Sequence, residues 1–310
     1  MSRIHEALKR AEEQRAASQG GHVPSAQNAE VTVTTPSMAA PHVESGSTGV
    51  ASAVPSFAAQ FTFDTLLARC PQHNWAPDTK TMLFFNAEEQ TYGTEEFRTL
   101  RSRLYQMREK IALKKVLITS ALPKEGKSFV AANLAQVMVR QHGRRALLID
   151  ADLRGARLHH ALGTSATPGL SEYLLGENDE FGVVQRGAME NLFFIPSGRS
   201  VSSPAELVAN GRLKILLNRL EPLFDWIIID SPPAVPVSDA GLLANYCDGV
   251  VMVVRSNATP SDIARKARQE FKDKHLIGVV LNGIEAGSTP YNQYYYGAYG
   301  RPSTKGTSQR

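Results

Sequence analysis

The sequence predicts an α/β protein built around a mostly parallel sheet with helices on both faces. Short apolar runs rich in β-branched residues alternate with helical patterns from about residue 80 onward. Runs that are apolar throughout are typical of strands buried on both faces of a parallel sheet. The predicted strands are Val116–Thr119, Ala146–Ile149, Leu192–Ile195, Trp226–Ile229, Val250–Val254 and Ile277–Leu281. Helices are expected between them, for example over Phe129–Arg140, Leu213–Leu220 and Asp262–Phe271.

The residues before this alternating region have a different composition. Apolar residues at helical spacing between charges predict a short amphipathic helix over residues 1–18, and whether it docks on a partner or is solvated stays open. The stretch that follows is rich in Ala, Ser, Thr, Gly and Pro, and cannot bury enough apolar surface to offset its ordering entropy. We therefore predict a flexible linker over residues 19–79, a folded domain over residues 80–286 and a flexible tail over residues 287–310.

The bulk composition excludes several classes of protein. The chain has 310 residues and a formal net charge of +4, which gives no reason to expect a nucleic-acid partner. Its two cysteines, Cys70 and Cys247, are far apart, so we expect no disulfide framework and a reducing compartment. No apolar run reaches the length of a membrane span, and the first residues lack the apolar core of a signal peptide. We therefore expect a cytoplasmic protein that reaches the inner face of the membrane only through a partner.

A phosphate-binding loop is predicted between the first strand and the following helix. The segment Ser120–Ser128 reads Ser-Ala-Leu-Pro-Lys-Glu-Gly-Lys-Ser, and its Ala121 stands where the usual pattern has glycine. Gly126 allows the backbone to approach phosphates, Lys127 can reach the β- and γ-phosphates, and the Ser128 hydroxyl can bind Mg²⁺. The predicted nucleotide-binding residues are Pro123, Lys124, Glu125, Gly126, Lys127, Ser128 and Phe129. The expected fold is therefore P-loop NTPase-like, with ATP and Mg²⁺ as ligands.

Carboxylates follow two of the predicted strands. Asp150 and Asp152 come at the end of one strand, and Asp230 ends another. In an open parallel sheet, ligands bind outside the carboxyl ends of the strands. Single aspartates there are often helix caps or turn formers, but three of them downstream of a phosphate loop favour a site. We predict Lys127, Asp150 and Asp152 as catalytic residues, and Ser128, Asp152 and Asp230 as metal ligands.

These motifs resemble those of the bacterial tyrosine kinase (BY-kinase) family of capsule and exopolysaccharide systems. The resemblance covers about residues 90–300. Residues Ala121–Ser128 resemble the Walker A motif of the family, although Lys124 stands where the family often has glycine. Leu147–Arg154 resembles its Walker A′ motif, and Ile227–Pro233 resembles its Walker B motif. The resemblance implies ATP-dependent transfer of phosphate to protein tyrosines.

A charged motif precedes the first strand. The sequence from Glu95 to Arg101 contains Glu-x-x-Arg-x-x-Arg, which places Glu95, Arg98 and Arg101 on one helical face. In general such a pattern is more often a salt-bridged face exposed to solvent. The family resemblance implies instead that the motif mediates self-association into a ring.

The tail holds a cluster of tyrosines. Five of the nine tyrosines in the chain fall within nine residues, next to glycines that give them no core to pack in. They are Tyr291, Tyr294, Tyr295, Tyr296 and Tyr299. The resemblance implies that this cluster is the phosphate acceptor of an autokinase that regulates exopolysaccharide synthesis or export.

The resemblance also implies partners. The membrane activator domain that is fused in some members has no counterpart in these residues, so a separate membrane-embedded activator is expected, together with a cognate phosphatase.

Two other functions remain as alternatives. One is a MinD/ParA-type ATPase switch without kinase activity, but such proteins carry a second lysine where this chain has Leu122, and they lack a tyrosine tail. The other is an adaptor that binds nucleotide without chemistry, which Lys127 and the three aspartates argue against.

Overall fold

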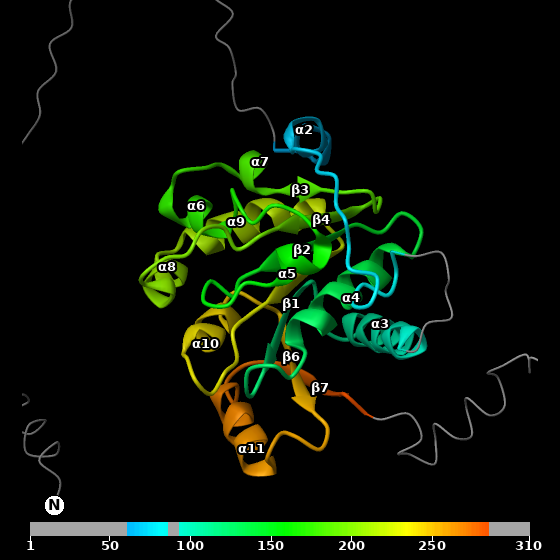
Figure 1. Cartoon of the computed structure of the whole chain (residues 1–310), viewed down its shortest axis with the longest axis vertical. Helices are drawn as coiled ribbons and strands as arrows, with labels where there is room; N and C mark the ends of the chain where they lie inside the picture. Colours follow the sequence, from blue (N-terminus) through cyan, green and yellow to red (C-terminus); the bar gives the residue numbers. More distant parts are fainter. Residues whose placement is uncertain (1–60, 86–92, 285–310) are drawn as a thin grey trace, which may run out of the picture. The chain divides into compact units, whose positions relative to one another are not determined.

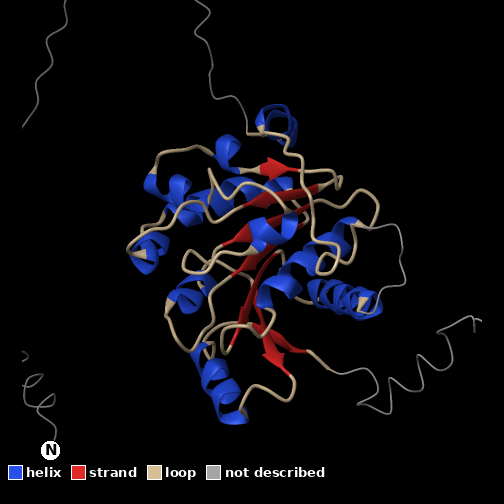
Figure 2. Ribbon diagram, viewed as in Figure 1, coloured by secondary structure: helices blue, strands red, loops and turns tan. Residues whose placement is uncertain are grey.

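The computed structural model describes residues 61–85 and 93–284. These residues form a seven-stranded sheet in the order β3-β4-β2-β5-β1-β6-β7, with helices on both faces (Figures 1 and 2). Every neighbouring pair is parallel except β3 and β4. The predicted α/β fold is therefore confirmed. The helix predicted for residues 1–18 and the tyrosine cluster lie outside the described residues.

All six predicted strands are present, and β3 is an addition to them. The strands are β1 (Lys115–Ser120), β2 (Ala146–Asp150), β3 (Gln185–Arg186), β4 (Leu192–Ile195), β5 (Trp226–Asp230), β6 (Gly249–Arg255) and β7 (Leu276–Asn282). The α-helices are α2 (Phe63–Arg69), α3 (Thr94–Arg108), α4 (Lys127–Val139), α5 (Leu158–Leu162), α6 (Leu170–Leu175), α7 (Glu180–Val183), α8 (Pro204–Ala209), α9 (Arg212–Leu220), α10 (Asp239–Ala244) and α11 (Ser261–Glu270). A 3₁₀ turn spans Glu221–Leu223. Among the described residues, no helix is both long enough and apolar enough to cross a bilayer.

The core has two layers, one on each face of the sheet. Helices α3 and α4 cover one face, and α8 and α10 lie on the other (Figure 1). Strands β2 and β5 are buried along their whole length, which explains their continuous apolar sequences. Their register places Asp150 directly opposite Asp230, and Asp230 opposite Ile118 of β1. The sheet order therefore brings the carboxylates predicted from distant motifs to one edge.

The folded domain begins earlier than the predicted boundary at residue 80. Helix α2 lies within the predicted linker, and its Leu66 is fully buried. The ring of Phe63 packs edge-on against Phe193 at 5.6 Å, and Trp75 packs against Phe194 at 6.2 Å. The buried Leu66 and Trp75 and the half-buried Phe63 hold this stretch on the domain, so the flexible-linker prediction is wrong for residues 61–79. The few apolar residues of this stretch were overlooked because the longer segment that contains it is mostly polar and small in composition.

Truncation tests this boundary. We expect deletion of residues 1–60 to leave the free energy of unfolding unchanged, because their composition cannot contribute a core. Deletion of residues 1–79 also removes Leu66 and Trp75, and should lower the free energy of unfolding by at least about 3 kcal/mol. Urea denaturation followed by circular dichroism measures both. Equal stability of the two truncated chains would show that residues 61–79 do not support the domain.

Candidate nucleotide-binding and catalytic site

The phosphate loop connects β1 to α4 at the carboxyl edge of the sheet. Gly126 has φ +95° and ends the loop, and Lys124 also has a positive φ of +66°. The positive φ favours glycine, and a Cβ atom on Gly126 would lie 2.0 Å from Nδ2 of Asn282 and would displace that side chain from the loop. The amide groups of the first turn of α4 have no partner in earlier helical turns, and are suited to bind an anion.

Side chains from three other segments hold this loop in place. Glu125 is buried, and its carboxylate accepts the amide N–H of Leu122 at 2.7 Å and the hydroxyl of Thr259. Asn282, the last residue of β7, donates from Nδ2 to the carbonyl of Glu125 at 2.9 Å. Arg255, the last residue of β6, donates to the carbonyl of Lys124 at 3.3 Å. The ends of β6 and β7 therefore fix the shape of the loop.

Lys127 and Ser128 meet the predicted aspartates. The Lys127 ammonium lies 2.8 Å from Oδ2 of Asp152 and 3.8 Å from Oδ2 of Asp230. The Ser128 hydroxyl donates to Oδ2 of Asp230 at 2.5 Å. Side chains from the P-loop, the end of β2 and the end of β5 thus converge at one point.

Asp150 lies deeper than the other two carboxylates. It is fully buried, and it accepts the amide N–H groups of Asp152 and Leu158, each at 3.2 Å. Burial raises the pKa of its carboxyl to about 8, and the charge of Asp230 adds to the rise. Asp150 therefore orders the loop that carries Asp152 and does not itself face solvent.

Burial sets the charge balance at the centre of the site. It raises the pKa of Asp230 to about 6, although Lys127 and the Ser128 hydroxyl oppose the rise. Burial by itself lowers the pKa of Lys127, but the carboxylates of Asp230 and Asp152 outweigh it, so the net pKa is raised. Lys127 is therefore a firmly protonated cation.

The oxygen atoms here fit a magnesium ion that arrives with phosphates. Oδ1 of Asp230 is buried and has no hydrogen-bond partner, which leaves one oxygen ready to accept a ligand. The Ser128 hydroxyl and the Asp152 carboxylate supply further hard oxygen atoms close by. No group of three or more His, Cys, Asp or Glu side chains in the described part of the chain forms a ready-made metal site. The two carboxylates of Asp152 and Asp230, together with the Ser128 hydroxyl, suit Mg²⁺, because this ion is commonly held by one or two carboxylates plus substrate phosphates.

The remaining predicted nucleotide-binding residues differ in what they can contribute. Pro123 and Lys124 lie in the loop, where Lys124 has an exposed side chain. The ring of Phe129 packs edge-on against Phe97 of α3 at 5.7 Å, so Phe129 can reach a nucleotide only through its main-chain amide.

Two residues, Arg154 and Glu125, support the site through side-chain contacts that the motifs did not indicate. Arg154, in the loop after β2, forms a two-point ion pair with Asp239, a buried residue that begins α10. Glu125 was predicted only as part of the loop, yet its side chain is a buried anchor. Local sequence shows only a carboxylate next to a glycine in the loop. The partners that make Glu125 an anchor, Thr259 and Asn282, are more than 130 residues away.

The predicted ring motif lies on α3 and its members differ in their contacts. Arg98 pairs with Glu95 one turn earlier. Arg101 donates to the carbonyl of Val137 in the last turn of α4 at 2.9 Å. Arg101 therefore ties α3 to α4, which sets the angle at which the rest of the motif is presented.

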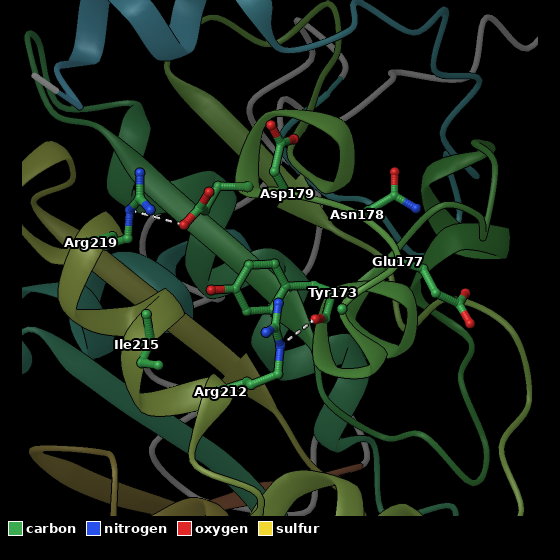
Figure 3. Close-up of a pocket in the computed structure, with 9 residues that line it drawn as sticks. Tyr173, Glu177, Asn178, Asp179, Arg212, Ile215 and Arg219 are labelled. Carbon is green, nitrogen blue, oxygen red and sulfur yellow. Dashed lines mark hydrogen bonds and ion pairs between the residues drawn. The ribbon is translucent and has the colours of Figure 1, made fainter. Parts of the chain in front are cut away.

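A surface hollow of about 650 Å³ lies elsewhere, among α6, α7 and α9 (Figure 3). Nε of Arg212 donates there to the carbonyl of Tyr173 at 2.9 Å, and Arg219 pairs with Glu180 at 2.9 Å. Both cations already have partners, and none of the P-loop residues lines this hollow. It is therefore not the site that the motifs predict.

Comparisons with known proteins agree on one group. A family model described as an AAA domain matches residues 124–260. Tyrosine-protein kinase YwqD of Bacillus subtilis is 37% identical over 214 residues, which cover 68% of this chain and 89% of YwqD. The putative tyrosine-protein kinase EpsB of Ralstonia nicotianae is 34% identical over 67% of this chain, but this match spans only 29% of EpsB. The kinase domain of Escherichia coli tyrosine kinase ETK superposes with a TM-score of 0.60 at 30% identity, covering 63% of this chain and 77% of that domain.

The buried Asp150 predicts a particular pH dependence of stability. Its pKa is about 8 in the folded chain, above the ordinary value of 3.8, so the folded state binds this proton more tightly. Stability from this group is therefore present at low pH and is lost as pH rises from about 4 to about 8. We expect the melting temperature of Asp150→Asn, relative to wild type, to be higher at pH 8 than at pH 5. Differential scanning calorimetry in EDTA measures this difference.

Asp78→Asn is the matched control. Hydrogen bonds from Lys80 and Thr81 lower the pKa of Asp78, so it stays ionised in both states across this range. The difference in melting temperature between Asp78→Asn and wild type should be the same at pH 5 and pH 8. If the melting-temperature difference between Asp150→Asn and wild type is also the same at both pH values, the assignment of Asp150 as a buried acid is contradicted.

Proposed function

This chain belongs to the bacterial tyrosine-protein kinases, and from that membership we propose that it transfers phosphate from ATP to its own C-terminal tyrosines. The enzyme is a protein-tyrosine kinase of the P-loop type. The observation that carries the proposal is the convergence of Lys127, Ser128, Asp152 and Asp230 at the carboxyl edge of the sheet. Phosphoryl transfer needs mainly positioning and charge stabilisation, and this cluster offers both.

Each member of the cluster has a distinct proposed role. The Lys127 ammonium stabilises charge on the phosphate oxygens, and the amides at the start of α4 orient them. Ser128 and Asp230, with Asp152, would hold Mg²⁺, which neutralises charge on the phosphates when bound. Lys127 and Ser128 are oriented before the nucleotide arrives, because each already contacts an aspartate.

The acceptor hydroxyl must lose a proton during transfer. A tyrosine hydroxyl has an ordinary pKa of about 10, so a nearby carboxylate assists its loss. We assign this role to Asp152, because its carboxylate lies at the Lys127 ammonium, where the phosphates would bind, while Ser128 and Asp230 supply the main metal ligands. Asp150 is fully buried and holds the amide of Asp152, so we assign it a positioning role.

The acceptor cluster lies outside the described residues, but its distance along the chain bears on the mechanism. Tyr291 comes seven residues after Ile284, where the described part ends. An extended chain covers at most about 3.3–3.6 Å per residue, which gives a reach of about 25 Å. That reach suits transfer to the active site of a neighbouring copy in a closed head-to-tail ring.

We extend the proposal to the partners of the enzyme. Glu95 and Arg98, presented by α3, would supply charged contacts between ring members, and Arg101 would support them. A membrane-embedded activator would recruit the kinase to the inner face of the membrane, and a phosphatase would reverse the modification. The cycle would regulate exopolysaccharide synthesis or export. EpsB is more than three times as long as the segment it shares with this chain, so roles of its other parts are not transferred.

Removal of the lysine charge tests the kinase assignment. Lys127→Met should abolish incorporation of phosphate from labelled ATP with Mg²⁺, while circular dichroism shows that the chain remains folded. Lys214→Met removes an exposed lysine of α9 and should retain activity. Autophosphorylation of Lys127→Met at the wild-type rate would remove the P-loop from the mechanism.

Ring assembly makes phosphorylation depend on concentration. An active chain with all five cluster tyrosines changed to Phe should phosphorylate the tail of a Lys127→Met chain when the two are mixed. The initial rate should rise faster than linearly with total protein, because the reactive pair forms by association. Glu95→Ala/Arg98→Ala should weaken this transfer. No transfer between the mixed chains would indicate that each tail enters its own active site.

A further inference from the structure

Helix α11 presents a basic flank to solvent. Its Ala267 and the following Phe271 face the core, and three cations are exposed: Arg265, Arg268 and Lys272. The i, i+3 spacing places Arg265 and Arg268 on one side of the helix, and Lys272 follows in the turn directly after it. The opposite flank alternates in charge through Asp262, Lys266 and Glu270 at i, i+4 and i+8. The two flanks of the helix therefore differ in electrostatic character.

The three cations of the basic flank have no acidic partner. Within the part of the chain that the structure describes, none of them lies within ion-pair distance of a carboxylate. Among those residues, the one hydrogen bond made by the three side chains joins Nε of Arg265 to the carbonyl of Ser261 in the same helix, at 3.3 Å. Their charge is therefore available to an anion that comes from outside the described residues.

Next to this flank, the edge strand β7 exposes apolar side chains. Val279 and Leu281 are 56% and 52% exposed. They are in register with Met252 and Val254 of β6, which point into the core layer that contains α11. Side chains in register on parallel strands point to the same face. Val279 and Leu281 therefore lie on the α11 face of the sheet, at its edge.

The connection between the strands brings the two features together. The path from β6 through α11 to β7 is a parallel crossover, and such crossovers are right-handed. With this hand, the flank of Arg265, Arg268 and Lys272 faces the β7 side of the helix. We name these three residues with Val279 and Leu281 the α11–β7 surface, located at the lower edge of the sheet in Figure 1.

The segment that follows β7 is the natural occupant of this surface. The backbone turns at Gly283, with φ +71°, directly after the strand. Tyr291 is seven residues beyond Ile284, a reach of about 25 Å. Helix α11 has ten residues and spans only about 15 Å, so the tyrosine cluster can reach any part of it.

We propose that the phosphorylated tail of this chain docks on the α11–β7 surface of the same chain, an inference that rests on the proposed autophosphorylation. Each phosphotyrosine carries about −1.5 to −2 charge and three acceptor oxygens, which match unpaired Arg and Lys side chains. The aromatic rings cover Val279 and Leu281. Helix α11 runs from the carboxyl ends of the strands towards their opposite ends, so a tail docked along the helix points away from the phosphate site, although Leu281 itself lies next to Asn282 of the loop contact. Phosphorylation then withdraws the tail from the catalytic sites.

The test uses the full-length Lys127→Met chain, which carries an unmodified tail. A fluorescent synthetic peptide of residues 287–300, phosphorylated at Tyr291, Tyr294 and Tyr295, is titrated with this chain and its anisotropy is measured. We expect it to bind roughly tenfold more tightly than the unmodified peptide at low salt, with the preference reduced by added salt. In the Lys127→Met background, Arg265→Gln/Arg268→Gln/Lys272→Gln should remove the preference. Lys266→Gln, on the opposite flank, should change the affinity by less than about twofold.

Wild-type protein shows whether the tail docks on its own chain. Its tail phosphorylation is measured by mass spectrometry, so a failure of the proposed function is seen independently of peptide binding. Phosphorylated wild type should bind the peptide several-fold more weakly than Lys127→Met does, because its own tail fills the surface; sedimentation of the same samples identifies the concentrations at which the chain is monomeric. Equal binding by phosphorylated and unmodified chains would overturn docking within one chain.

Two results with the basic flank would also overturn the proposal. The first is unchanged preference for the phosphorylated peptide in the triple variant. The second is binding of phosphatidylglycerol vesicles through the same three cations, without preference for the phosphorylated peptide, which would assign the surface to a membrane instead.

Discussion

The charge of Lys127 is the interaction on which the site depends. Its ammonium lies among three carboxylates that the sheet places at the ends of β2 and β5. One buried cation cannot balance three ionised acids, which is why burial leaves Asp150 and Asp230 with raised pKa values. The cluster therefore favours an added positive charge, and a magnesium ion arriving with phosphates supplies it. The residues that would bind the nucleotide and metal are therefore the same ones whose burial costs free energy in their absence.

The rest of the fold serves to keep this cluster in register. Strand β5 lies between β1 and β2, so the P-loop and both acidic strand ends open at one edge. Arg255 at the end of β6, Asn282 at the end of β7 and Thr259 in the turn after β6 then hold the loop. Because the same β7 leads into the tyrosine tail, the strand that holds the phosphate loop also delivers the proposed acceptor. The geometry of the phosphate loop and the position from which the tyrosine tail leaves the domain therefore both depend on β7.

Local sequence patterns predicted much of this arrangement, but contacts between residues far apart in the chain could not be predicted from them. Apolar runs and the Gly-Lys-Ser motif predicted the strands, Lys127 and the three aspartates, because each signal lies within about ten residues. The buried role of Glu125 could not be predicted in this way, since its partner Thr259 is far along the chain. The contribution of Trp75 was missed because a few apolar residues were averaged into a long polar stretch. Asp150 was predicted as catalytic, but its depth became apparent only from the packing around β2.

The central claim is that this cluster modifies tyrosines that follow β7. Incubation of the purified full-length protein with ATP and Mg²⁺, followed by mass-spectrometric mapping of every phosphorylated residue, tests it most directly. We expect phosphotyrosine concentrated between Tyr291 and Tyr299, with no label when ATP is omitted. Phosphate found only on serine or threonine, or on tyrosines within the folded domain such as Tyr173, would contradict it.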